Sequence, residues 1–415
     1  MQVHRYSVAA ASVARVSLSG RHHHPAGLPA QRCRRSFRAT TESRSPRSGA
    51  GGGKDHGAPR SSSSSSSSKH PSQRRPLTAR PPPFPTVPTC PPPTCDCAAT
   101  PPPPEGLEID RTSPLNGVMA GYAEQVLVCT GRDDWTSRIE DENGGENLAA
   151  DLKGLYGLGG KYRDPFHNTS ILNASFPSSA ASRQASTGSQ TTSSVYLLPS
   201  FKYVPWVSRA SSGDSVRALV EGYLLPTKLH RAHDVLPLAQ REQLTRKPAA
   251  RKLLHGVQDV REVMVLICGH GGRDMRCGIA GPVLSGEFEA RLPQLGVPVA
   301  ADPVVIEEET DIDAESVATR RHGEAVTLGK GVAARVGLIS HIGGHKFAGN
   351  VILYIPPGTK TRDGGDHPLE GKGIWYGRVE PKHVDGIIRE TILDGKVIQD
   401  MFRGGIDQDR HILRI

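Results

Sequence analysis

Two pairs of side chains that commonly bind metals lie on glycine-rich stretches in the C-terminal half of the 415-residue chain. Cys268 and Cys277 are separated by eight residues, three of them glycine, and His341 and His345 by three residues, two of them glycine. Glycine lets a loop fold back, so both sulfurs of the first pair can point into one volume. Two thiolates and two imidazoles form a four-ligand set that suits Zn²⁺ or a [2Fe–2S] cluster in which two histidines replace two cysteines.

The spacing of the cysteines bears on the choice between these two metal centres. Structural zinc ligands usually come in pairs separated by roughly two to four residues, so Cys268 and Cys277 are widely spaced for a single ion. A dinuclear cluster is larger, and the neighbouring glycines allow backbone amides to approach its bridging sulfides, where hydrogen bonds tune the reduction potential. Composition alone leaves both metals open.

Other chemistry has to be weighed for the same residues. His270 lies two residues from Cys268 and is a competing ligand. Cys268 could also serve as the nucleophile of a cysteine-based redox enzyme, although a dithiol oxidoreductase prefers the spacing C-x-x-C, which the folded part lacks. A thiol phosphatase needs C-x5-R, whereas Cys268 and Arg273 have the spacing C-x4-R. The other histidines considered lack a partner at ligand spacing and are expected to be structural or exposed: His322, His367 and His383.

The elements that must position the ligands follow one another in the order of a thioredoxin-like fold. Residues 262–267 form a short apolar run that leads into Cys268 and Gly269, as a buried strand does when it ends in a functional loop. The order β-α-β and then β-β-α brings this loop and the histidine loop to the same end of a sheet. The predicted elements are strands at 262–267, 304–307, 335–340, 350–355 and 374–379 and helices at 284–292 and 383–393.

A similar strand signal occurs earlier in the chain, at residues 125–131, and it also ends at a cysteine and a glycine, Cys129 and Gly131. The similarity of these two strand signals is consistent with an internal duplication. The other elements expected here are helices at 147–155 and 215–225, strands at 170–176 and 195–207, and a Ser- and Thr-rich insertion at 178–194 that is expected to be disordered. The sequence therefore predicts an α/β protein with an N-terminal α/β domain at 106–230, a linker at 231–254 and a thioredoxin-like domain at 255–415. A thioredoxin-like fold is one candidate for the first domain.

The first quarter of the chain differs in composition from the rest. Residues 1–104 hold 18 of the 34 prolines and carry 15 basic against three acidic side chains, a net charge of +12. Residues 105–415 carry a net charge of −3, so the basic character of the whole chain belongs to a tail and a nucleic-acid-binding function loses its support. No apolar run approaches the length of a membrane span. A disordered Ser/Pro-rich tail is expected at 42–105.

Residues 1–41 have the composition of a mitochondrial transit peptide. They contain seven arginines and several serines but no acidic residue, and they lack the apolar stretch of a secretory signal. We therefore expect a mitochondrial protein that engages the import machinery, in the matrix or the intermembrane space. Farther along the tail, Cys90, Cys95 and Cys97 lie among prolines and are expected to be redox-labile thiols rather than metal ligands.

Several stretches from about residue 106 onward resemble the sucrase/ferredoxin-like family. The stretches are residues 115–117 and 124–135, the Cys268/Cys277 pair, and residues 341–350 and 375–379. The most specific part is the combination of Cys-x8-Cys with His-Ile-Gly-Gly-His. The resemblance implies a thioredoxin-like ferredoxin domain that holds a [2Fe–2S] cluster through two cysteines and two histidines. By position these ligands are Cys268, Cys277, His341 and His345.

Together these features predict a mitochondrial [2Fe–2S] protein that acts in electron transfer or thiol redox quality control with an unidentified redox partner protein. Imidazole ligation would raise its reduction potential above that of an all-cysteine ferredoxin. Two alternatives come from other functional classes. One is a structural zinc module that serves binding, and the other is a cysteine-based redox enzyme that uses Cys268.

Overall fold

The computed structural model describes residues 81–94, 96–179, 192–210, 212–306, 326–327 and 333–415. All of them belong to one compact unit, Pro76–Ile415. The predicted transit peptide at 1–41, Cys95, His322 and most of the predicted insertion at 178–194 lie outside the described residues. Within these ranges no helix is long and apolar enough to cross a membrane.

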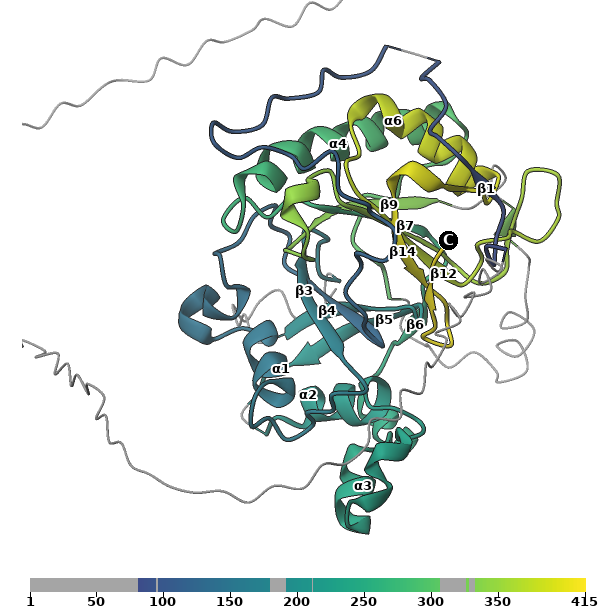
Figure 1. Cartoon of the computed structure of the whole chain (residues 1–415). Coiled ribbons are helices and arrows are strands. Elements are labelled where there is room, and N and C mark those ends of the chain that lie inside the picture. Colours follow the sequence, from purple (N-terminus) through teal and green to yellow (C-terminus); the bar gives the residue numbers. More distant parts are fainter. Residues whose placement is uncertain (1–80, 95, 180–191, 211, 307–325, 328–332) are drawn as a thin grey trace, which may run out of the picture. The chain divides into compact units, whose positions relative to one another are not determined.

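An eleven-stranded mixed sheet forms the centre of the unit, in the order β15-β14-β12-β10-β7-β9-β3-β2-β4-β5-β6 (Figure 1). Its strands are β2 (Glu124–Cys129), β3 (Thr169–Ala174), β4 (Thr192–Leu198), β5 (Lys202–Ser208), β6 (Gln258–Asp259), β7 (Val263–Cys268), β9 (Ala334–Ile339), β10 (Val351–Ile355), β12 (Lys372–Tyr376), β14 (Phe402–Ile406) and β15 (Ile412–Leu413). Strands from both predicted domains, 106–230 and 255–415, therefore pair in one sheet. Two short pairs lie beside it: β1 (Thr86–Val87) with β13 (Val397–Ile398), and β8 (Val326–Thr327) with β11 (Thr359–Lys360).

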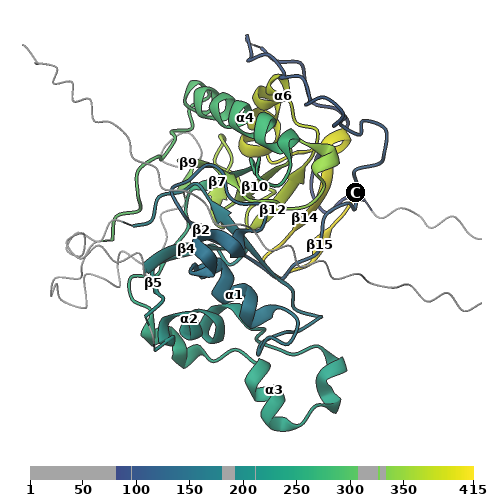
Figure 2. The same cartoon turned by 90° about the vertical axis from the view of Figure 1, so that its left-hand side faces the viewer.

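The predicted α/β class is confirmed, and in the described part of the chain four α-helices pack on one face of this sheet. Helices α4 (Met275–Gln294) and α6 (Pro381–Gly386) lie together over the C-terminal strands, and α1 (Leu148–Tyr156) and α2 (Asp214–Leu219) lie over the N-terminal strands (Figure 2). The remaining helical segments are α3 (Leu238–Leu244), the π-helical continuations Val220–Leu224 and Ile387–Leu393, and 3₁₀ turns at Ile139–Gly145, Arg231–Val235, Pro248–Leu253, His345–Phe347 and Gln399–Met401.

The central strand β7 is buried on both faces. Val263, Val265 and Ile267 pack in the core shared with the helices, whereas Met264, Leu266 and Cys268 belong to a second core on the opposite face. This division follows from the alternation of side chains along a strand. It explains why β7 reads as an uninterrupted apolar run, and it sets the side of the sheet on which Cys268 lies.

The same strand arrangement occurs twice in the sheet. In the C-terminal half, β7 and β9 are parallel and β10 and β12 follow antiparallel, in the order β9-β7-β10-β12. In the N-terminal half, β2 and β3 are parallel and β4 and β5 follow antiparallel, in the order β3-β2-β4-β5.

The two halves meet at an antiparallel contact between β3 and β9. There the Ser340 hydroxyl accepts a hydrogen bond from the Asn173 amide, and the Ser175 hydroxyl accepts one from the Leu338 amide, both at 3.0 Å. The exchange is reciprocal, so the junction has approximate two-fold symmetry. This symmetry fits the internal duplication that the strand signals suggested.

The structure differs from the sequence-based expectation for residues 81–105, which were assigned to a disordered tail. Phe84 is buried in the core, β1 pairs with β13, and the Ala98 amide donates to Glu287 on α4 at 2.9 Å. Proline has no amide hydrogen, so a proline-rich segment needs few backbone partners and can lie extended on a surface. One phenylalanine and a few polar contacts fix this strap, which average composition does not reveal.

Several other predicted elements also differ in detail. The strand predicted at 195–207 is a hairpin of β4 and β5, and the linker at 231–254 contains α3 and two 3₁₀ turns. Residues 304–306 form no strand, and residue 307 lies outside the described residues. The last predicted helix, 383–393, begins earlier, at Pro381, because Glu380 and His383 form a capping box that starts α6 there.

Candidate metal centre

The two cysteines come from adjacent ends of a strand and a helix. Cys268 is the last residue of β7, and Cys277 lies in the first turn of α4. Asp274 caps this helix, since its side chain accepts a hydrogen bond from the Arg276 amide at 3.1 Å. Both cysteine side chains are buried, at 1% and 0% exposure.

Glycines allow the helix to approach the loop closely enough to bring the sulfurs together. A Cβ atom on Gly278 would lie 2.5 Å from the Cα atom of Gly271, and one on Gly281 would lie 2.6 Å from the Cα atom of Gly269. Helix α4 therefore packs directly on the backbone of the cysteine loop. The glycines noted in the sequence serve this contact as well as the turn itself.

The histidine loop leaves the sheet beside the cysteine loop. Strands β7 and β9 are parallel, and Cys268 is in register with Ile339, so both loops leave the same sheet edge. Gly343 and Gly344 have positive φ angles of 82° and 76°, which turn the chain between the two histidines. The imidazole rings of His341 and His345 lie with their centroids 5.2 Å apart.

The electrostatics of the two cysteines show that they interact with each other and that Cys268 interacts with His341. Hydrogen bonding from the Cys277 side chain, and then the contact with His341, hold the pKa of Cys268 well below its usual range. The pKa of Cys277 is raised because its thiol is hydrogen-bonded to Cys268 and is buried. The Nδ1 atoms of His341 and His345 are buried and have no hydrogen-bond partner. The Asp274 carboxylate lies 4.0 Å from the Nδ1 atom of His345. Buried nitrogens without a hydrogen bond, beside two buried thiols, form a donor set that a metal centre would satisfy.

His270, the competing ligand, is engaged elsewhere. Its Nδ1 atom accepts from the His341 amide at 3.1 Å, and its Nε2 atom lies 3.1 Å and 2.9 Å from the carbonyl oxygens of Trp135 and Thr136. Both ring nitrogens are used, so His270 supports the two loops rather than joining the donor set. The sequence places His270 near Cys268 but does not reveal these partners.

The remaining predicted residues lie away from the centre or have structural partners. His367 is buried and bonds to the Ile392 carbonyl and the Leu369 amide, and His383 belongs to the capping box of α6. The Cys90 thiol donates to the His383 carbonyl at 3.6 Å. Cys129 is buried in the second core, where burial raises its pKa. These residues therefore add no ligand to the centre.

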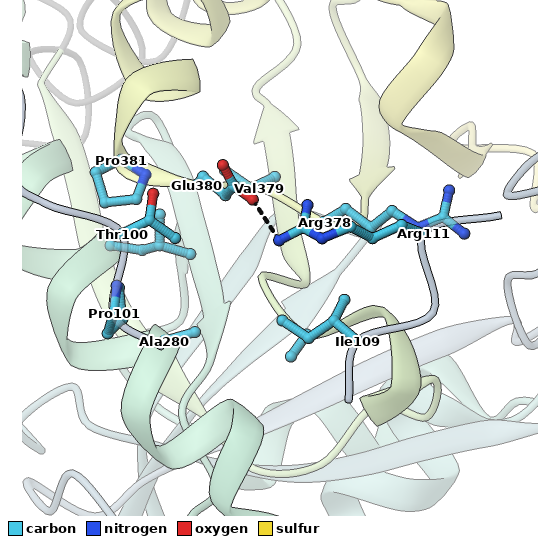
Figure 3. Close-up of a pocket in the computed structure, with 11 residues that line it drawn as sticks. Thr100, Pro101, Ile109, Arg111, Ala280, Arg378, Val379, Glu380 and Pro381 are labelled. Carbon is cyan, nitrogen blue, oxygen red and sulfur yellow. Dashed lines mark ion pairs between the residues drawn. The ribbon is translucent and has the colours of Figure 1, made fainter. Parts of the chain in front are cut away.

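Two hollows lie near these loops. A shallow depression of about 540 Å³ is lined by residues 117–120, residues 342–347 and Arg403, so His345 is one of its lining residues. The sequence pattern does not mark Arg403 as a functional residue, because it is a single arginine within the short strand β14. A second cavity, of about 30 Å³, lies between the strap and the start of α6, beside the Arg111–Glu380 ion pair of 2.7 Å (Figure 3). It has room for one or two water molecules and none for a substrate.

Comparison with known proteins gives the family. The sucrase/ferredoxin-like family model matches residues 115–404. The chain belongs to this family. The matched stretch includes all four members of the donor set.

Named relatives come from yeasts. Altered inheritance of mitochondria protein 32 of Debaryomyces hansenii is 28% identical over 310 residues, which cover 73% of this chain and 89% of the relative. The protein of the same name from Meyerozyma guilliermondii is 29% identical over 213 residues, 51% of this chain and 57% of the relative. Actin patches distal protein 1 of Saccharomyces cerevisiae is 29% identical over 205 residues, which cover 49% of this chain and 48% of the relative. No solved structure matches the chain.

Proposed function

We propose that this chain is a mitochondrial [2Fe–2S] protein that acts in electron transfer or thiol redox quality control. The observation that carries the proposal is the convergence of two buried thiols with two imidazoles whose Nδ1 atoms are buried and have no hydrogen-bond partner. The ligands would be Cys268, Cys277, His341 and His345, the set that the sequence predicts. Two thiolates and two imidazoles are a known ligand set for this cluster type.

The spread of the donors favours a cluster over a single zinc ion. Ligands around one tetrahedral ion lie within about 4 Å of one another, given bond lengths of about 2.0–2.3 Å. Among the described residues, one set of three such side chains has all its donor atoms within 4.8 Å of one another: Asp407, Asp409 and His411 on an exposed turn. No three of the four candidate donors meet this criterion, although Cys268 contacts Cys277 and His341. We take this spacing to favour a dinuclear cluster, whose ligands are shared between two iron atoms, over a single ion.

The strand arrangement supports the finer part of the fold prediction. In the C-terminal half, β7, α4 and β9 are followed by β10, β12 and α6, which is the connectivity expected of a thioredoxin-like domain. The N-terminal half repeats the same strand order. We propose a thioredoxin-like fold for both halves, with the ligand set confined to the second. In the first half, Cys129 occupies the position of Cys268, but Phe176 follows β3 where His341 follows β9.

When bound, the cluster would supply one-electron oxidation and reduction. Cys268 and Cys277 would hold it from the buried side, where their thiolates are shielded from water. His345 is 45% exposed, so a redox partner would approach from the histidine side. Neutral imidazoles add no negative charge, which raises the reduction potential relative to four thiolates.

A mitochondrial location is part of the proposal. The names of the relatives from Debaryomyces and Meyerozyma refer to the inheritance of mitochondria. The composition of residues 1–41 is that of a transit peptide. Both point to import, with the matrix and the intermembrane space as the two candidate compartments.

Purification of the full chain under anaerobic conditions tests the proposal. A red-brown protein with visible absorption bands and bound iron is expected, and this colour should be lost in the His341→Ala and His345→Ala variants. A colourless protein that retains one zinc per chain would replace the proposal with the zinc module. A metal-free protein whose Cys268 forms a covalent adduct with a substrate would replace it with the cysteine enzyme.

A further inference from the structure

Arg403 is a buried cation without an acidic partner. Its side chain is 1% exposed, and no aspartate or glutamate among the described residues acts on its charge. Its Nη1 atom donates to the Asn350 side chain at 2.5 Å, its Nη2 atom donates to the Val118 carbonyl at 3.0 Å, and its Nε atom is buried without a partner. Burial of an unpaired charge is costly, so such a residue requires a compensating interaction.

A β-bulge directs this side chain toward the candidate centre. Trp375 pairs with Gly404 and Tyr376 pairs with Phe402, so Arg403 is an extra residue in β14. In a regular strand Arg403 would lie on the face opposite Gly404 and Ile406, whereas here its guanidinium lies over the Trp375 ring, 5.6 Å from the centroid. Bulges often occur beside functional sites, where they redirect one side chain.

Arg403 and Asn350 both donate hydrogen bonds to the loop between the two histidines. Arg403 donates to the carbonyl of Gly343 at 3.3 Å, and the Asn350 side chain donates to the carbonyl of Gly344 at 3.1 Å. A Cβ atom on Gly344 would lie 2.5 Å from an Nη atom of Arg403, so the glycine is required for this close approach. The loop that carries His341 and His345 is therefore fixed from beneath by one charged side chain.

The charges that act on Arg403 belong to the candidate ligands. Burial lowers the pKa of Arg403 to about 10, and electrostatic interaction with the side chains of Cys268 and Cys277 opposes this shift. Arg403 therefore stays protonated at neutral pH. A negatively charged metal centre held by Cys268 and Cys277 would compensate the buried charge of Arg403.

We propose that Arg403 is a positioning residue that fixes the His341–His345 loop and raises the reduction potential of the centre. This inference rests on the proposed [2Fe–2S] function. Reduction adds one electron, supplied by an electrode or a reduced partner, and no covalent bond forms or breaks. A fixed positive charge stabilises the more negative reduced form more than the oxidised form, so it favours reduction.

Three variants of the full chain test this role. Arg403→Gln removes the charge, and Arg403→Lys keeps the charge but loses the forked hydrogen bonds. Asn350→Asp places a carboxylate on Arg403 and compensates its charge, but it also loses the hydrogen bond from Asn350 to the Gly344 carbonyl. Arg335→Gln is the matched control, because Arg335 is a buried arginine of β9 that bonds to Glu262 and to the Asp302 carbonyl.

The measurements are the midpoint potential, the bound iron, and hydrogen exchange of the amides of residues 341–349. Arg403→Gln and Asn350→Asp should each lower the equilibrium constant for reduction about tenfold, which is 59 mV for one electron. Arg403→Lys should stay closer to the wild-type potential but exchange its loop amides faster, and Arg335→Gln should change neither. If Arg403→Gln does not fold, Asn350→Asp supplies the test of the charge.

Two results would count against different claims. An iron-loaded wild-type protein whose potential and loop exchange are unchanged in Arg403→Gln and Asn350→Asp would overturn the role of Arg403 alone. A wild-type protein without iron would overturn the proposed function and the effect on the potential with it. In that case, loop exchange in Arg403→Gln would still decide whether the residue fixes the loop.

Discussion

Replacement of Gly278 by alanine would separate the two cysteines while leaving all four ligands in place. The new Cβ atom would lie 2.5 Å from the Cα atom of Gly271, and an ordinary contact begins at 3.4 Å. The start of α4 must therefore move by about 1 Å relative to the loop that follows Cys268. Metal–ligand distances tolerate only about 0.2 Å of error, so we expect Gly278→Ala to lose most of its bound cluster.

Gly286→Ala is the matched control for this change. It lies in the same helix, and its Cβ atom would meet nothing within 4 Å. Both alanines gain about 0.5–1 kcal/mol from helix propensity, so this gain nearly cancels between them. The difference in their free energies of unfolding then contains the cost of overpacking, about 1–3 kcal/mol, and the stabilisation that is lost with the cluster.

Iron analysis and urea denaturation of the two purified variants measure both effects. We expect Gly286→Ala to keep the wild-type iron content and to unfold at a slightly higher urea concentration than wild type. Gly278→Ala should be low in iron and less stable than Gly286→Ala. A fully loaded Gly278→Ala protein as stable as the control would refute the argument that glycine contacts position the sulfurs.

The other predictions concern ligands, pH and targeting. Cys277→Ser should lose the visible absorption of the cluster, whereas Cys129→Ser should keep it; a spectrally unchanged Cys277→Ser protein would remove Cys277 from the ligand set. Burial lowers the pKa of His367 to about 4, so only the unfolded chain takes up its proton as the pH falls from about 6.5. The free energy of unfolding should therefore fall by up to about 3 kcal/mol between pH 6.5 and 4, and urea denaturation of His367→Asn should show a smaller loss; equal losses would assign the effect to other groups. Deletion of residues 1–41 should leave the protein able to bind the cluster but abolish its import into isolated mitochondria, and unaltered import would place the signal elsewhere.

The four candidate ligands could be proposed from the sequence because their residue types and short spacings are those of a metal site. Cys268, Cys277, His341 and His345 lie on two glycine-rich loops, and the order of apolar runs places both loops at one sheet edge. In the structure Cys268 interacts with Cys277 and His341, and the His341 and His345 rings lie 5.2 Å apart. That these side chains hold a metal stays a prediction. The exclusion of His270 was not predictable, because its partners are carbonyl groups of residues 135 and 136, distant in the sequence.

Arg403 and the strap at 81–105 show what a pattern of residue types does not contain. A β-bulge is a matter of strand pairing, so the sequence around Arg403 does not show which face the side chain takes. The strap is anchored mainly by Phe84 and by hydrogen bonds to α4 and α6. Its overall composition resembles that of a disordered tail, because a single buried phenylalanine hardly changes the average.

The central claim is that two cysteines and two histidines hold a [2Fe–2S] cluster in this chain. Pulsed electron paramagnetic resonance of the reduced protein tests it most directly, because nitrogen ligands couple to the electron spin of the cluster. We expect a reduced-cluster signal with couplings from two imidazole nitrogens. The His345→Cys variant should retain the signal but show coupling from only one imidazole nitrogen. An iron signal without nitrogen coupling, or a protein that contains zinc and gives no signal, would contradict the claim.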